Sequence, residues 1–275
     1  MRKLLNIELI KLVNSTSFKV ILGLHLVLFS LVIFTSSQVE LTFPGFDTTN
    51  LFKFPYVWSY FAWIASWFNL LLAIAVIMIT GNEFSFRTFR QHLIDGLERI
   101  ELLYGKLVVI FLIALYSFVL VFFSGIIYGS VFTSEFSIIN FFSNIDILLV
   151  YFLQALGYMV AALMLTVILR STALSIILFI LFRFPIEPVI RSFFDPAIRP
   201  FFPMKAIGSL TPLPEFISIS SEGTFETAEG GNALSLSEIG LVTNGLPLYG
   251  QIFLAAGYIV LFLFITSFAL KNRDL

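Results

Sequence analysis

Six long apolar segments alternate with polar stretches along the chain. A helix that crosses a bilayer needs about 20 predominantly apolar residues. Segments close to that length are Phe18–Thr35, Pro55–Thr80, Leu107–Phe132, Ile145–Leu169, Ser171–Ile190 and Gln251–Leu270. The pattern predicts an all-α, polytopic membrane protein with six transmembrane helices, which form a single domain over residues 1–275.

Composition supports this class. Hydrophobic residues make up 59% of the chain and charged residues 12%, whereas a soluble domain has about a quarter of its residues charged. The fifth apolar segment ends in a cluster of polar residues and prolines. Arg183 and Glu187 are four residues apart, so they are placed to pair on one helix face, and Pro185 and Pro188 should bend or end the helix there.

The distribution of Lys and Arg predicts the orientation. If residue 1 is in the cytoplasm, eleven of the 16 Lys and Arg residues fall on the cytoplasmic side and five on the other. The positive-inside rule therefore favours a multi-pass protein of the cell membrane with both termini in the cytoplasm.

An N-terminal segment, residues 1–17, precedes the first span. At helical spacing it places apolar side chains on one side and polar side chains on the other, as in a helix that lies in the membrane interface. The alternative is a straight extension of the first span into the cytoplasm. The apolar side consists of Leu5, Leu9 and Leu12, and the polar side of Lys3, Glu8, Lys11 and Asn14.

Residues 82–106 form a long, mixed-charge connection between the second and third spans. Two antiparallel helices need only about two to eight connecting residues. Apolar residues recur at steps of three and four through this segment, and Asp95-Gly96 interrupts them. We expect a helix over Asn82–Ile94, a turn at the glycine, and a second helix that enters the third span. A structured element of this kind indicates a docking site for a soluble partner; the alternative is an ordinary solvated hairpin.

Residues 191–250 form a large extracytoplasmic loop in this orientation. Its first half is rich in Phe and Pro and should pack on the membrane or dip into it. Its second half is rich in Gly, Ser and Glu and should be exposed to water.

Motifs for catalysis are missing from the sequence. It contains no GxxxxGK[ST] pattern, so phosphate binding by a P-loop is excluded, and the lack of HExxH, GxSxG and cysteine argues against the common metalloprotease, serine hydrolase and thiol sites. The two histidines, His25 and His92, fall on different segments, which argues against a metal site. We expect a chain that is not itself an enzyme, holds no metal or cofactor, and has no nucleic-acid partner.

Three polar residues fall at membrane depth, namely His25, Asn69 and Gln154. Such residues inside a bundle usually make hydrogen bonds between helices and less often contact cargo. We find no Asp, Glu, Lys or Arg in the middle of a span, and ion-driven carriers generally need one. Energy for any transport is therefore expected to come from another subunit.

The chain resembles the permeases of type-2 class ABC exporters, which are encoded separately from their ATPase. The opening IELIKLVNSTSFKVIL is similar to the interfacial helix and first span of that family, and FFPMKAIGSLTPLPEF to its proline-containing connection before the last span. The most specific likeness is GNEFSFRTFRQHLIDGLERIELLYGKL, at residues 81–107, which is similar to the coupling helix that sits in a groove of the ATPase. Ser218–Gly240 has no counterpart in the family.

The resemblance implies a division of labour between subunits. The partner ATPase would bind ATP and Mg, and two permease copies, as a homodimer or with a sister permease, would form the path for cargo by alternating access. The coupling element would comprise Glu83, Arg87, Thr88, Arg90, Gly96, Arg99 and Lys106. Apolar residues that would face the ATPase groove or the ends of the spans are Phe86, Phe89 and Leu93.

Functions from other classes also remain possible. The same connection would serve a membrane scaffold or signalling protein that moves no cargo. An ATP-independent channel or lipid scramblase is a third alternative. The sequence does not identify a cargo.

Overall fold

The computed structural model describes the chain in several ranges. Between them lie connections at residues 40–41, 44–45, 213–245 and parts of 87–97. The described residues are 2–39, 42–43, 46–86, 88, 91, 94, 96, 98–135, 137–212 and 246–272.

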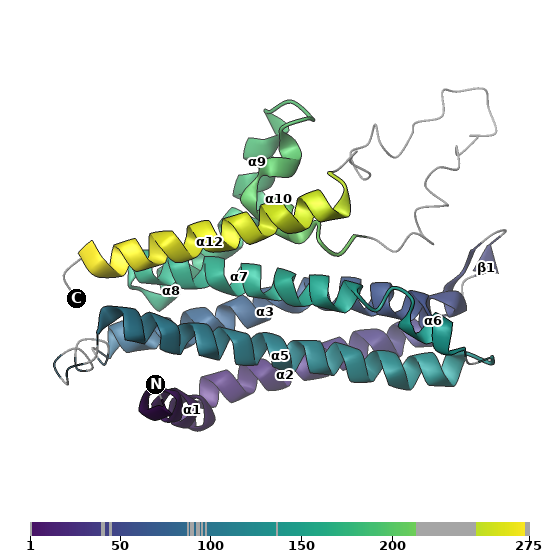
Figure 1. Ribbon diagram of the computed structural model, residues 1–275, viewed down its shortest axis with the longest axis horizontal. Coiled ribbons are helices and arrows are strands. Elements are labelled where there is room, and N and C mark those ends of the chain that lie inside the picture. The colour runs from purple at the N-terminus through teal and green to yellow at the C-terminus, as the bar shows by residue number, and fades with distance from the viewer. Residues whose placement is uncertain are drawn as a thin grey trace.

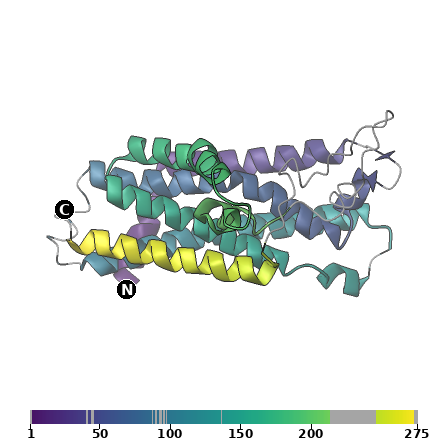
Figure 2. The same cartoon turned by 90° about the horizontal axis from the view of Figure 1, so that it is seen from above.

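Long helices lie side by side along the length of the described molecule (Figures 1 and 2). Within the described residues, six of them are long and apolar enough to cross a membrane, which confirms the predicted spans and indicates a multi-pass membrane protein. Strand pairing there is confined to β1 (Thr42–Phe43) and β2 (Phe46–Asp47). The crossing segments are α2 (Thr16–Ser37), α3 (Tyr56–Ser85), α5 (Arg99–Phe132), α6–α7 (Ile138–Phe142 and Ile147–Leu169), α8 to α9 (Thr172–Ser192) and α12 (Leu248–Asn272).

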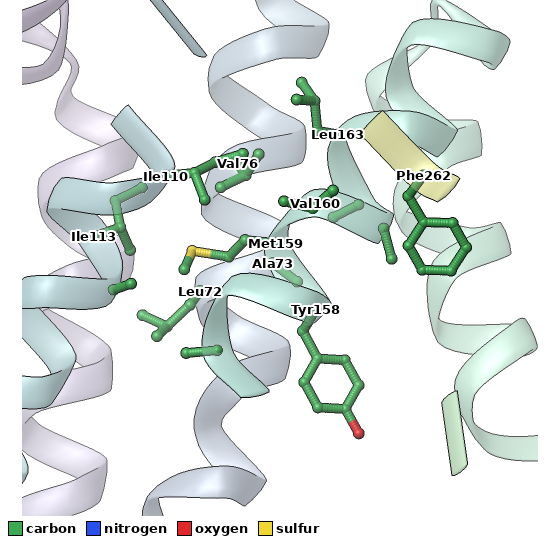
Figure 3. Close-up of a cluster of buried hydrophobic side chains, with 14 of the residues drawn as sticks. Leu72, Ala73, Val76, Ile110, Ile113, Tyr158, Met159, Val160, Leu163 and Phe262 are labelled. Carbon is green, nitrogen blue, oxygen red and sulfur yellow. The ribbon is translucent and has the colours of Figure 1, made fainter. Parts of the chain in front are cut away.

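The two central helices, α3 and α7, carry most of the buried core. Figure 3 shows side chains from α3, α5 and α7 meeting in one apolar cluster, with Phe262 of α12 at its edge. A second cluster, rich in aromatic residues, surrounds Trp58 and Phe61 near the start of α3. Since lipid is as apolar as these side chains, helix association in a bilayer depends on close packing more than on water exclusion.

Glycines in α5 allow that close packing. A Cβ at Gly125 would lie 2.6 Å from the Trp58 ring, and a Cβ at Gly129 would overlap the Phe54 ring. Both rings belong to the segment at the start of α3, so these two positions set how closely α5 approaches it.

The N-terminal helix α1 (Arg2–Asn14) is separate from α2. Ser15 between them is extended, and its hydroxyl accepts a hydrogen bond from the Phe18 amide, so it caps α2. The alternative of a straight extension is therefore wrong. The predicted faces of α1 are also wrong, because Glu8 and Leu12 are buried together while Leu9 is 43% exposed. Glu8 is buried because it pairs with Lys106, as described below.

The fifth apolar segment bends at its proline, as predicted. Helix α8 (Thr172–Leu181) leads into a π-helical turn, η2 (Phe182–Ile186), which contains Pro185, and then into α9 (Glu187–Ser192). Proline has no amide hydrogen, so the helical ladder is interrupted there. In Figure 1, α9 points away from the long axis about halfway along the bundle.

The chain then returns toward the bundle through η3 (Arg199–Phe201) and α10 (Pro203–Gly208). Met204 and Ile207 of α10 are buried in the core, so this part of the loop over residues 191–250 packs on the helices, whereas Phe193 before it is 83% exposed. The rest of that loop, including Ser218–Gly240, lies outside the described residues.

The predicted pairing of Arg183 with Glu187 is wrong. The Glu187 carboxylate instead accepts hydrogen bonds from the backbone amides of Met204 (2.9 Å) and Lys205 (2.6 Å). These amides lie in the first turn of α10, where backbone donors have no partner within the helix. These helix-end amides therefore bind the Glu187 carboxylate. Because the chain bends at Pro185, Arg183 forms no salt bridge with it.

A glycine substitution tests the packing of α5 against α3. Gly125→Ala adds a methyl group against the Trp58 ring, and overpacking of this kind costs about 1–3 kcal/mol, which the better helix propensity of Ala offsets only in part. We expect a lower thermal unfolding midpoint in detergent. Gly23→Ala in α2 is the matched control, because no atom lies within 4 Å of its Cβ position. Equal midpoints for the two variants would contradict the packing described here.

Candidate functional site

Four charged side chains meet where α1, α3 and α5 come together. The Lys106 ammonium lies 2.6 Å from Oε1 of Glu83 and 2.8 Å from Oε2 of Glu8. The Lys11 ammonium lies 2.9 Å from Glu83 and 3.3 Å from Glu8. Each lysine thus contacts both carboxylates. We call these residues the four-charge cluster.

The cluster is balanced in charge and shielded from water. Glu8, Glu83 and Lys106 are 3%, 6% and 3% exposed. Burial lowers the pKa of Lys11, but the nearby carboxylates of Glu83 and Glu8 outweigh it and raise the pKa above its ordinary value. Because an isolated buried charge is costly, the opposite charges of the cluster offset one another's desolvation.

The cluster joins both ends of the predicted coupling segment to α1. Glu83, at the start of the segment, is in the last turn of α3, and Lys106, its last residue, is near the start of α5. These two residues were predicted to belong to the coupling element. The structure places their side chains inward, against α1, where they hold the segment to the bundle.

Other members of the predicted coupling element are positioned by local bonds. The Thr88 hydroxyl donates to the Glu83 carbonyl at 3.3 Å. Gly96 has a φ of 92°, a left-handed conformation that favours glycine, as the predicted turn requires. The Arg99 guanidinium donates to the carbonyls of Leu270 (2.9 Å) and Lys271 (2.7 Å), which are end groups of α12 without a helical partner.

The remaining members divide into one exposed residue and several outside the described part of the chain. The Phe86 side chain is 75% exposed directly after α3, and Ile94, farther along the same connection, is 77% exposed. Helix α5 begins at Arg99 with a capping box in which Glu98 and Glu101 each bond the other's backbone amide. This start confirms the predicted second helix that enters the third span. Outside the described residues lie Arg87, Phe89, Arg90 and Leu93.

At membrane depth, the predicted bond between helices is present at Asn69 and Gln154. The Asn69 amide of α3 donates to Oε1 of Gln154 on α7 at 3.4 Å, and the Thr211 hydroxyl donates to the same oxygen at 3.0 Å. The Gln154 amide nitrogen donates to the carbonyls of Ile207 and Gly208, each at 3.1 Å. Gln154 therefore links α3, α7 and α10.

His25 does not follow the prediction. It is fully buried, and neither ring nitrogen has a hydrogen-bond partner among the described residues. Aromatic rings surround it, with centroids 6.5 Å away for Phe29, 6.1 Å for Phe68 and 5.7 Å for Tyr116. No three His, Asp or Glu side chains gather as metal ligands in the part of the chain that the structure describes.

Sequence reasoning missed Glu8 and Lys11 as members of this site. One feature of the sequence pointed to burial of Glu8, because Glu8 is four residues before Leu12 and lies on the same helix face. The identity of the partners was not available, because Lys106 is almost 100 positions away and is surrounded in sequence by apolar residues.

Charge removal tests the four-charge cluster. Lys106→Met leaves two buried carboxylates with one lysine, and a buried ion pair that loses one partner costs about 3–5 kcal/mol, so we expect a large fall in the thermal unfolding midpoint. Glu83→Gln added to Lys106→Met restores charge balance and should recover part of that loss. The control is Lys19→Met at an exposed position of α2. If Lys106→Met alone is as stable as this control, the four-charge cluster does not contribute the expected stability.

Comparison of the chain with models of known protein families and with curated proteins finds no match. The likeness of residues 81–107 to exporter permeases therefore stays a prediction from the sequence. The structure itself contributes a membrane-type helix bundle, a buried four-charge cluster beside the connection between α3 and α5, and a polar link at Gln154.

Proposed function

We propose that the chain is the permease subunit of an ATP-driven exporter of the type-2 ABC class and couples to a separate ATPase through residues 82–106. The observation that carries this proposal is the four-charge cluster, which ties both ends of that segment to α1. A partner that moves the segment then moves α1, α3 and α5 together.

The position of the segment supports mechanical coupling. Helices α3 and α5 run most of the length of the bundle (Figure 1), and they begin or end at the cluster. Separating the cluster would leave buried charges unpaired, at a cost of about 3–5 kcal/mol. A displacement of the segment therefore moves the long helices, because moving them costs less free energy than separating the four-charge cluster at their ends.

Exposed apolar side chains on the connection supply a surface for the partner. Phe86 and Ile94 are both about three-quarters exposed, and they lie beyond the ends of the spanning helices, where lipid chains would not cover them. Large apolar side chains of this kind are typical anchors in a protein interface. The connection over residues 86–98 is also longer than the roughly two to eight residues that join antiparallel helices.

The proposal assigns the remaining roles to other subunits. The ATPase holds ATP and Mg and hydrolyses the nucleotide, and a second permease copy or a sister permease completes the path through the cell membrane. The Lys and Arg distribution favours a cytoplasmic position for α1 and both termini, on the same side as the ATPase.

Purification from the native membrane in mild detergent tests the partnership. A soluble ATPase should accompany the tagged chain in equal amount and be lost when the sequence of residues 86–93 is scrambled. Phe86→Ala should weaken the complex about tenfold or more, because burial of a Phe side chain contributes about 1.5–3 kcal/mol. Phe142→Ala is the control, since that residue is 60% exposed on α6 at the opposite end of the bundle. A chain that purifies without any ATPase, even after cross-linking, would favour the scaffold function.

Coupling itself is tested by ATP turnover of the complex in proteoliposomes. We expect Arg90→Glu and Phe89→Ala to lower the turnover that the permease stimulates, while the thermal unfolding midpoint of the permease stays unchanged. Unaltered turnover in both variants, with the complex intact, would argue against a coupling role for the segment.

A further inference from the structure

A pocket of about 320 Å³ opens between α3, α7, the η2 turn and α10. Aromatic and apolar side chains line most of it, and Trp67 and Phe184, at 68% and 54% exposed, form part of its lining. Helix α10, which ends at the lining residue Gly208, and α9, which follows the lining residue Phe184, lie about halfway along the bundle in Figure 1. In a bilayer crossed by this bundle, exposed side chains at that depth would meet lipid chains.

Arg183 is the cation of this pocket. Among the described residues its guanidinium takes part in no ion pair within 4.0 Å, because Glu187 is held by the amides of Met204 and Lys205. The guanidinium instead lies over the Tyr158 ring, 5.3 Å from its centroid, and 5.5 Å from that of Phe184. A cation in an apolar wall is stabilised only in part by aromatic faces.

The lining of the pocket carries a positive charge. Among the described residues that form it, Arg183 is the charged one, and no carboxylate lines the pocket. Glu187 interacts with Arg183 and Arg191, but its carboxylate already accepts two backbone hydrogen bonds.

The polar groups left for a ligand are hydrogen-bond donors. Tyr158 is 3% exposed, and its hydroxyl lies beside the Arg183 guanidinium, with no carbonyl or carboxylate among the described residues to accept its proton. Figure 3 shows this ring pointing away from the apolar cluster. Gln154, also at the pocket, is already bonded to Asn69, Thr211 and two carbonyls. A guanidinium and a hydroxyl without acceptors favour an anionic group.

We propose that this pocket binds the headgroup of an anionic amphiphile from the membrane. The phosphate or carboxylate lies against Arg183 and the Tyr158 hydroxyl, and the apolar chain runs over Trp67 and Phe184 into the surrounding lipid. The aromatic lining favours an amphiphile over a free anion, because a small ion would leave these side chains uncovered. The inference rests on the pocket and its charges and does not depend on the exporter function.

Tryptophan fluorescence of the full chain in proteoliposomes tests the site, since two of its three tryptophans, Trp63 and Trp67, line the pocket. Phosphatidylglycerol with brominated acyl chains, which quench on contact, is compared with brominated phosphatidylcholine at the same mole fraction. We expect a preference for the anionic lipid of roughly tenfold, the size of one charge-assisted hydrogen bond. Equal quenching by the two lipids would overturn the proposal.

Matched variants separate the pocket from general electrostatics. Arg183→Gln should remove the preference, Arg183→Lys should keep a reduced one, and Tyr158→Phe should lower it. Arg191→Gln makes the same charge change outside the pocket lining and should leave the preference in place. A preference that survives Arg183→Gln, or that Arg191→Gln abolishes equally, would overturn the proposal. Loss of the preference on adding inorganic phosphate would show binding of a free anion and overturn the amphiphile.

Discussion

The desolvation of charge at one end of the bundle constrains most of the structure around it. Lys106 is almost fully buried, and a buried ammonium is stable only beside carboxylates. Glu83 at the end of α3 and Glu8 on α1 provide them. This requirement turns the face of α1 that carries Glu8 inward, holds the ends of α3 and α5 together, and fixes the start and finish of the connection that leads to the proposed ATPase contact.

Two polar groups nearer the middle of the bundle, Gln154 and Arg183, differ in how fully their hydrogen-bonding groups and charge are paired. Gln154 satisfies its donors and acceptor with Asn69, Thr211 and the carbonyls of α10, so it acts as a structural link. Arg183 has no such set of partners, because the bend at Pro185 and the amides of α10 separate it from Glu187. Gln154, whose hydrogen bonds are satisfied, therefore serves helix packing. Arg183, which lines a pocket without a carboxylate partner, is the basis for the proposed anionic ligand.

Prediction from sequence succeeded where a single segment determined the outcome. The six apolar segments, the bend at Pro185 and the glycine turn at Gly96 follow from local chemistry and are present in the structure. It failed for the faces of α1, for the partners of His25 and for the pairing of Arg183 with Glu187. In each of these cases a distant element supplied or removed the partner: Lys106 drew Glu8 inward, aromatic rings enclosed His25, and α10 took the Glu187 carboxylate.

By itself the sequence determined the number of apolar helices, because a bilayer demands about 20 apolar residues for each crossing. It also determined where helices start, stop or bend, since capping residues, glycine and proline act over a few positions. Only the tertiary structure decided which charges meet. Residues 8, 83 and 106 lie on three different helices, and the energy that pairs them depends on distance in space and on burial, neither of which is encoded at any one position.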